Sequence, residues 1–134
     1  MNFKLSEKFL LTQLLSCVLA FCVSQYSFGQ ITTIKAGAIC TVIDGDGGYG
    51  IIKILVMDKK MVHVKVYKNK YKKRPTRINV QSLSVGSMYD DDDFGFGHLP
   101  LNRKEFESWK PLQISFQKIT KDEMEGYELW KENH

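Results

Sequence analysis

The chain has 134 residues, of which 43% are hydrophobic and 25% are charged, and its formal net charge at pH 7 is +4. A chain of this length can bury one modest hydrophobic core, which excludes an organisation into two full domains. The positive charge is mild, so its distribution along the chain is more informative about partners than its sum.

The first 29 residues have the layout of a secretory signal peptide. Lys4 and Lys8 precede an apolar stretch over residues 9–23, and Ser27 and Gly29 place small residues three and one before a cleavage point. We expect cleavage after residue 29. The prediction is therefore a signal peptide over residues 1–29 and a single small β-rich domain over residues 30–134, secreted into the periplasm or the extracellular space.

Two alternatives stay open for this leader. The first is an uncleaved membrane anchor, although Thr12, Gln13 and Ser16 interrupt the apolar stretch and it falls short of the roughly 20 residues that span a bilayer. The second is lipidation at Cys17, because residues 14–17 loosely resemble a bacterial lipobox. After cleavage only Cys40 remains, so an internal disulfide is excluded. Because Cys40 lies within an apolar run, we predict that it is buried like a small hydrophobic residue.

Hydrophobic periodicity and turn residues then predict about five short strands and two short helices. The expected strands cover residues 38–43, 49–57, 61–67 and 112–119, and residues 78–85 are expected to form another short strand or an extended segment. The Asp- and Gly-rich residues 44–48 predict a hairpin turn. The third strand can continue to residue 71 before Pro75 ends it. The expected helices cover residues 103–109 and 120–132, each opened by a capping box, Asn102 with Glu105 and Thr120 with Glu123.

This order of elements predicts an α+β fold: a small, strongly bent antiparallel sheet, or an SH3-like barrel, of about five strands capped by two short helices. The strand over residues 61–67 shows the clearest alternation. One of its faces carries Val62, Val64 and Val66, and the other carries His63, Lys65 and Tyr67. We expect the valine face to lie on the core and the other face to lie in water.

Residues 65–77 are rich in cations and tyrosines and contain no acid. The candidate binding residues are Lys65, Tyr67, Lys68, Lys70, Tyr71, Lys72, Lys73, Arg74 and Arg77. Cations beside aromatic rings suit an anionic protein, glycan or lipid surface. Nucleic acid would use the same chemistry but is at odds with export. The alternative is that these lysines are solvated charges that protect an edge strand from pairing with another sheet.

The four aspartates of residues 90–93 predict a solvated acidic loop. A calcium site and a contact with the basic strand are the alternatives, although consecutive carboxylates do not converge as calcium ligands do. Residues 94–98 alternate aromatic residues with glycine, and we expect a β-bulge that places Phe94 and Phe96 in the core. The alternative is that these residues line a ligand groove.

His63, His98 and His134 have no metal-ligand spacing, so we expect neither a metal centre nor another cofactor. No residue has the setting of an activated nucleophile, which predicts no catalytic residues. We expect His98 to be structural and to donate to a backbone carbonyl. An enzyme would need His98 and a carboxylate of residues 90–93 to line one cleft.

Residues 35–40 and 48–55 resemble the opening hairpin of small β-barrel bacterial immunity proteins, which protect a cell by binding a toxin. Residues 63–75, 95–101 and 126–130 resemble parts of a family of small, uncharacterised exported bacterial proteins. The sequence thus predicts an exported, non-enzymatic binding module whose basic, tyrosine-bearing strand contacts an anionic partner. The alternative that the resemblance implies is an envelope immunity-type protein that neutralises a toxin by protein–protein binding.

Overall fold

The computed structural model describes residues 33–90 and 93–134. The predicted signal peptide, the lipidation alternative at Cys17 and two of the four consecutive aspartates, Asp91 and Asp92, lie outside the described residues. No described helix combines the length and the apolar character that crossing a membrane requires.

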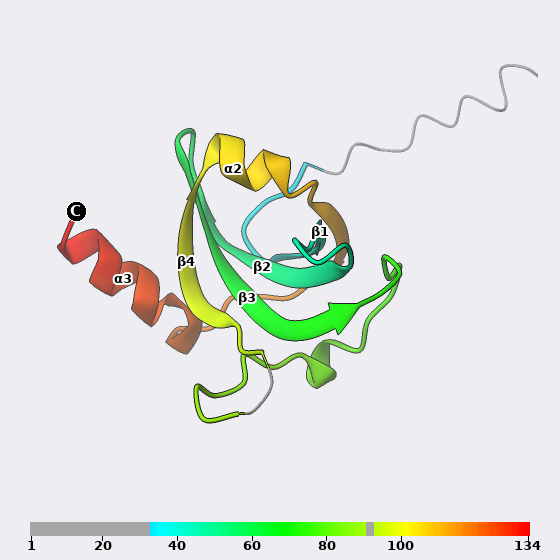
Figure 1. The fold of residues 1–134 in the computed structure, drawn as a ribbon. Coiled ribbons are helices and arrows are strands. Elements are labelled where there is room, and N and C mark those ends of the chain that lie inside the picture. Colours follow the sequence, from blue (N-terminus) through cyan, green and yellow to red (C-terminus); the bar gives the residue numbers. More distant parts are fainter. Residues whose placement is uncertain (1–32, 91–92) are drawn as a thin grey trace, which may run out of the picture. The chain divides into compact units, whose positions relative to one another are not determined.

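The described residues form one five-stranded antiparallel sheet of order β4-β3-β2-β1-β5 (Figure 1). The strands are β1 (Ala38–Ile43), β2 (Tyr49–Met57), β3 (Met61–Tyr71), β4 (Phe96–Asn102) and β5 (Leu112–Phe116). The helices are α2 (Arg103–Ser108), α3 (Glu125–Glu132) and the short 3₁₀ turns η1 (Val80–Ser82) and η2 (Asp122–Met124). The predicted α+β class, with five strands and two short α-helices, is confirmed.

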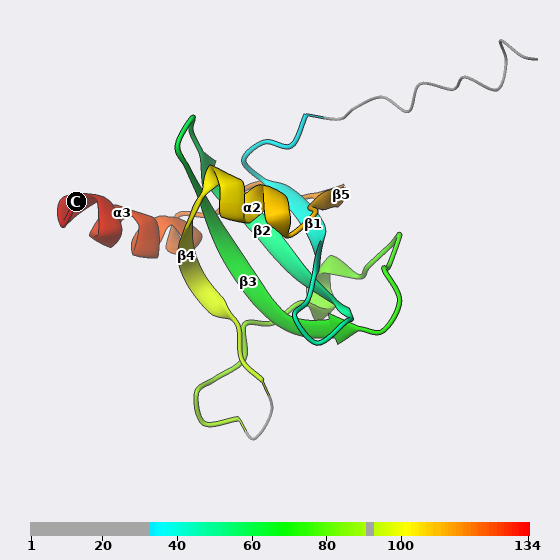
Figure 2. The same ribbon diagram turned by 45° about the horizontal axis from the view of Figure 1, so that its top comes forward.

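The sheet is strongly bent and open. Its long strands β2 and β3 curve across the molecule (Figures 1 and 2). Register shifts interrupt the pairing of β1 with β5, of β2 with β3 and of β3 with β4, and such bulges bend and twist a strand. Among the described residues β4 and β5 are the two edges and do not pair with each other. The closed, SH3-like barrel is therefore not confirmed.

Both faces of the sheet are buried. The first face packs against α2 through the buried Phe106, and its core comprises Ala38, Cys40, Val42, Ile52, Ile54, Val62, Val64 and Leu101. The second core contains Ile39, Ile51 and Tyr67. Its cover is an irregular run, residues 78–85, which we call the covering segment and which contributes Ile78, Val80, Leu83 and Val85.

The face of β3 that was predicted to lie in water is thus buried, and that prediction was wrong. His63 is 1% exposed and Tyr67 is 5% exposed. The two sets of alternating side chains do separate as expected, with Val62, Val64 and Val66 on the first core. The covering segment and the C-terminal residues lie over the opposite face, and no local pattern in β3 reveals that cover.

Residues 78–85 were predicted to form a short strand or an extended segment, and the strand alternative was wrong. Residues 78–85 form η1 and extended backbone, with the Asn79 side chain capping the turn by accepting from the N–H of Gln81. The fourth strand is instead β4, whose Gly97 and Pro100 look like strand breakers in the sequence. Proline is tolerated there because β4 is an edge strand.

The Phe-Gly-Phe stretch leads into β4, but its rings are not in the core. Phe94 is 45% exposed and Phe96 is 48% exposed, so their predicted burial was wrong. Gly95 passes so close to β3 that a Cβ there would overlap the carbonyl oxygen of Val66. The predicted bulge lies further along, at Gly97 and His98, where the register shifts between the pairs Val64–Leu99 and Val66–Phe96.

The local polar predictions hold at several points. The Asn102 side chain accepts from the N–H of Glu105 at 2.8 Å, and the 44–48 turn closes through the N–H of Asp44 donating to the carbonyl of Gly48 at 2.9 Å.

The third strand runs to Tyr71, and β5 ends at Phe116 rather than at residue 119. Cys40 is buried, and that burial raises the pKa of its thiol to about 12.

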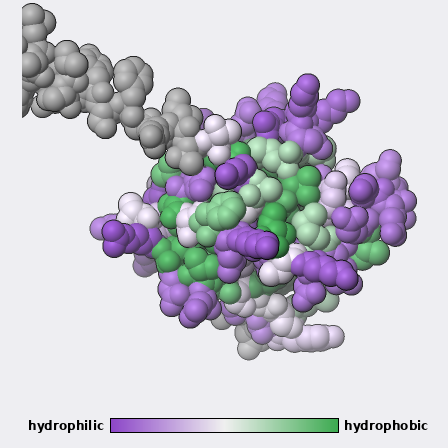
Figure 3. All heavy atoms as spheres, turned by 180° about the vertical axis from the view of Figure 1, so that it is seen from behind, coloured by the Kyte–Doolittle hydropathy of each residue, from purple (hydrophilic) through white to green (hydrophobic). Residues whose placement is uncertain are grey.

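Apolar side chains also reach the surface. On the face seen from behind they lie among hydrophilic ones (Figure 3). The exposed large hydrophobic residues of β1 and β5 are Ile43, Leu112 and Phe116.

Candidate functional site

The cations of the predicted basic strand fall into two groups, and those within β3 are paired with carboxylates. Lys65 pairs with Glu123 at 3.1 Å, Lys68 pairs with Asp90 at 3.4 Å and Lys70 pairs with Asp44 at 2.7 Å. Tyr67 is buried, and Tyr71 is half-buried against the second core. β3 lies between β2 and β4, but its pairing with β4 covers only Met61 to Val66, so Lys68 and Lys70 lie beyond it.

The cations beyond β3 differ from those within it. We call residues 72–77 the basic loop. Arg74 is fixed, since its guanidinium donates to the carbonyl of Lys110 at 2.8 Å and lies 5.0 Å from the centre of the Tyr49 ring. Lys72, Lys73 and Arg77 are exposed and, within the described residues, form no ion pair and no side-chain hydrogen bond.

The two described aspartates of the acidic stretch, Asp90 and Asp93, are exposed as predicted, and Asp90 also follows the alternative of a contact with the basic strand. Asp90 contacts the basic strand through Lys68, and it also accepts from the N–H of Ser87 at 2.9 Å. These hydrogen bonds lower its pKa. Asp93 is exposed. The described residues contain no group of three or more potential metal ligands.

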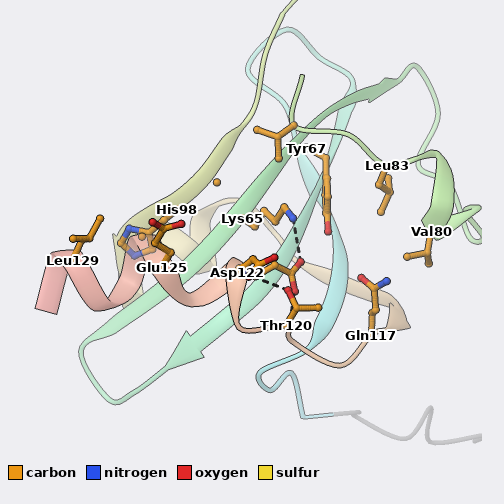
Figure 4. Close-up of a pocket in the computed structure, with 14 residues that line it drawn as sticks. Lys65, Tyr67, Val80, Leu83, His98, Gln117, Thr120, Asp122, Glu125 and Leu129 are labelled. Atoms are coloured by element: carbon orange, nitrogen blue, oxygen red, sulfur yellow. Dashed lines mark hydrogen bonds and ion pairs between the residues drawn. The ribbon is translucent and has the colours of Figure 1, made fainter. Parts of the chain in front are cut away.

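A groove of about 720 Å³ lies over the second face of the sheet (Figure 4). Its lining comes from β3, from β4, from the covering segment and from residues 117–129. One side is apolar, with Val80, Leu83 and Val85, while Lys65 and Tyr67 border its middle. His98 lines the far end, whereas Asp90 and Asp93 are not part of the lining.

A buried lysine cluster, made of Lys53, Lys65 and Glu123, lies beneath this groove. Lys53 of β2 is 0% exposed, and its ammonium donates to the Gln117 side chain at 3.1 Å, to the Lys118 carbonyl at 3.2 Å and to Glu123 at 2.7 Å. All three donors of the ammonium are therefore used. The cluster ties the C-terminal residues to the sheet.

Glu123 is the anion of this cluster. Burial by itself would raise the pKa of Glu123, but hydrogen bonds from Lys53, from the N–H of Thr120 and from Lys65 outweigh it and lower the pKa to about 2. The reciprocal contact, from the N–H of Glu123 to the Thr120 hydroxyl at 3.4 Å, completes the predicted capping box. That box opens η2, and α3 begins only at Glu125.

A histidine pair, His63 and His98, holds α3 against β3 and β4. Nδ1 of His63 and Nε2 of His98 are 2.9 Å apart, so one ring donates and the other accepts. The edges of Tyr127 and Trp130 contact His63, with ring centres 4.8 and 4.5 Å away. Burial is the main cause that lowers the pKa of both imidazoles. His98 is thus bonded to a second histidine instead of the predicted backbone carbonyl.

Gly126 allows α3 to approach this pair. A Cβ at Gly126 would lie 2.6 Å from Cβ of His98. Gly126→Ala would ordinarily stabilise a helix by about 1 kcal/mol, but here we expect a loss of about 1–3 kcal/mol in the free energy of unfolding, because the helix must move. Urea denaturation checks this. Glu128→Ala on the exposed side of α3 is the control, and equal effects of the two variants would contradict the close packing.

Comparison with known proteins gives no match: no family model, no curated protein and no solved structure is similar to this chain.

Proposed function

We propose that this protein is an exported, non-enzymatic binding module and that its basic loop contacts an anionic partner. The observation that carries the proposal is the contrast between two groups of cations. Lys65, Lys68 and Lys70 are neutralised by carboxylates of the same chain. Lys72, Lys73 and Arg77 are exposed and have no such partner among the described residues.

The base of the basic loop supports this role. Arg74 stacks on Tyr49 and donates to the carbonyl of Lys110, which fixes the loop where it leaves the sheet. A fixed base reduces the ordering entropy that binding costs. The free cations can therefore meet an anionic protein, glycan or lipid surface with little rearrangement.

A pair of triple variants tests the proposal. Lys72, Lys73 and Arg77 are replaced with glutamine in one variant, and the exposed Lys104, Lys121 and Lys131 in the other, so that both lose the same charge. Binding is measured on immobilised heparin and on vesicles containing phosphatidylglycerol, at 50 and 300 mM salt. We expect the basic-loop variant to lose most of its retention and the control variant to keep it.

Salt must weaken the binding of the wild type, because exposed charges are screened over about 8–10 Å at physiological ionic strength. Equal retention of the two triple variants, or binding that does not respond to salt, would refute the role of the basic loop.

An immunity-type protein that neutralises a toxin is the second candidate function. It is favoured by exposed apolar side chains that lie near the acidic residues: Met88 is 77% exposed and Tyr89 is 93% exposed, and the Phe94 and Phe96 rings pack edge to face. Aromatic residues and methionine are enriched in protein–protein interfaces. A toxin encoded beside this gene, with growth inhibition that the wild type relieves, would favour this function over the first.

A further inference from the structure

Tyr67 is a buried residue whose hydroxyl opens into the groove. Its side chain is 5% exposed and lines the groove, yet its hydroxyl forms no hydrogen bond with the described residues. Burial, and to a smaller extent the charge of Glu123, raise the pKa of Tyr67 to about 12, so the hydroxyl keeps its proton and can donate. Because the hydroxyl is reached from the groove and is not engaged by the described residues, it can donate to an acceptor bound there.

Other available donors line the same groove, one on the half-buried Lys65 and two on the exposed Gln117 and Thr120. Lys65 uses one of its three ammonium protons, on Glu123. Gln117 accepts from Lys53 through its oxygen, and its NH₂ group has no partner among the described residues. Thr120 accepts from the N–H of Glu123, which leaves its hydroxyl proton available. Figure 4 shows Lys65, Tyr67, Gln117 and Thr120 around the same hollow.

The charge beneath the groove is also unbalanced. Lys53 and Lys65 bring two positive charges, and Glu123 brings one negative charge. Their side chains are only 0%, 21% and 10% exposed, so water screens the remaining charge poorly. Asp122 and Glu125 also line the groove, but both are exposed to solvent. The buried cluster therefore carries one excess positive charge, which favours an anion at Lys65, whereas the two carboxylates at the rim oppose an anion and are screened by solvent.

The wall beside these donors is apolar. Val80, Leu83 and Val85 of the covering segment form one side, and Leu129 of α3, which is 56% exposed, stands at the other end. The groove volume of about 720 Å³ lies within the range of small-molecule sites. We infer that the groove binds an apolar monocarboxylate, such as a medium-chain fatty acid, with the carboxylate at Lys65 and Tyr67 and the chain along the covering segment.

Three ligands with the same alkyl chain test this inference on the full chain. Decanoate, decanol and decyltrimethylammonium are titrated by isothermal calorimetry and by ¹H–¹⁵N NMR. We expect decanoate to bind at least about tenfold more tightly than the other two, with shifts of the backbone amides of Lys65, Tyr67 and Leu83. Absence of decanoate binding, or equal affinity for decanoate and decanol, would overturn the inference.

Variants separate the floor from the wall. Tyr67→Phe removes only the hydroxyl, and we expect it to weaken decanoate about two- to tenfold, as the loss of one hydrogen bond does, without changing decanol. Leu83→Asn, in the apolar wall, should weaken both ligands. Tyr89→Phe, which alters an exposed tyrosine outside the groove, is the control and should change neither. All variants contain the same residues 1–32. If decanoate bound outside the groove, Tyr67→Phe would not change its affinity, and that result would count against the site.

Discussion

Lys53→Met should lower the free energy of unfolding by about 3–5 kcal/mol, the usual cost of removing one partner from a buried ion pair. Methionine fills a similar volume but cannot donate a hydrogen bond. The variant therefore removes the donor to the Gln117 oxygen and to the Lys118 carbonyl, and it leaves Oε2 of Glu123 with the N–H of Thr120 alone. Urea denaturation followed by tryptophan fluorescence measures the change, because Trp109 packs on the first core and Trp130 reports on α3.

The matched control is Lys70→Met. Lys70 pairs with Asp44 at the same distance, 2.7 Å, but its side chain is 44% exposed, and such surface pairs contribute about 0–1 kcal/mol. If both variants lose the same stability, burial of Lys53 is not what gives this contact its strength. Lys53→Met combined with Glu123→Gln should recover part of the loss. In the double variant residue 123 is uncharged, so the missing cation no longer leaves a buried carboxylate short of positive charge.

The parts of the fold that depend on local chemistry could be predicted from the sequence. The β1–β2 hairpin follows from a turn rich in Asp and Gly between two apolar runs. The third strand follows from its alternation, and Asn102 and Thr120 are typical capping residues. Each of these features is decided by side chains within a few residues of one another.

The second buried face could not be predicted in this way. The alternating His63, Lys65 and Tyr67 look like a solvent-facing set, and only the distant covering segment and α3 bury them. The sequence does contain one indication, a charged Lys53 in the middle of an otherwise apolar strand. A lysine in such a run requires a buried acceptor, but the run itself does not identify Glu123, which lies seventy residues further along.

The candidate binding residues were predicted as one surface, and the fold separates them. Lys65 and Tyr67 face the groove, whereas Lys72, Lys73 and Arg77 lie exposed in the basic loop. His63 and His98 are 35 residues apart, so a search for ligand spacing within one segment could not pair them. Only the pairing of β3 with β4, which was not predicted, brings the two rings together.

The free energy of unfolding should decrease as the pH falls below 6.5, and α3 should be the first element to detach from the sheet. The imidazoles of His63 and His98 have pKa values below their ordinary value of 6.5, mainly because they are buried, and each charge would also disfavour the other. The unfolded chain, whose imidazoles titrate normally, then binds more protons than the folded chain just below pH 6.5. Stability is therefore full above pH 6.5 and decreases as the pH falls toward the lowered pKa values.

His98→Gln isolates this effect, because glutamine can still donate and accept beside His63 but does not titrate near neutral pH. Free energies of unfolding from urea denaturation at pH 7.5, 6.5 and 5.5 should decrease in the wild type by up to about 1.4 kcal/mol per pH unit for each proton taken up on unfolding, and less in the variant. Amide hydrogen exchange should place the early loss of protection in α3.

Carboxylates do not produce the same decrease in this range. The pKa values of Glu123 and Asp58 are lowered from ordinary values of 4.5 and 3.8, so their contribution to stability is complete above about pH 5 and is lost only in stronger acid. His134→Gln, which alters a histidine that stacks on Trp130 in an exposed position, is the control and should keep the wild-type profile. If His98→Gln and His134→Gln both follow the wild type between pH 7.5 and 5.5, the histidine pair does not control the docking of α3.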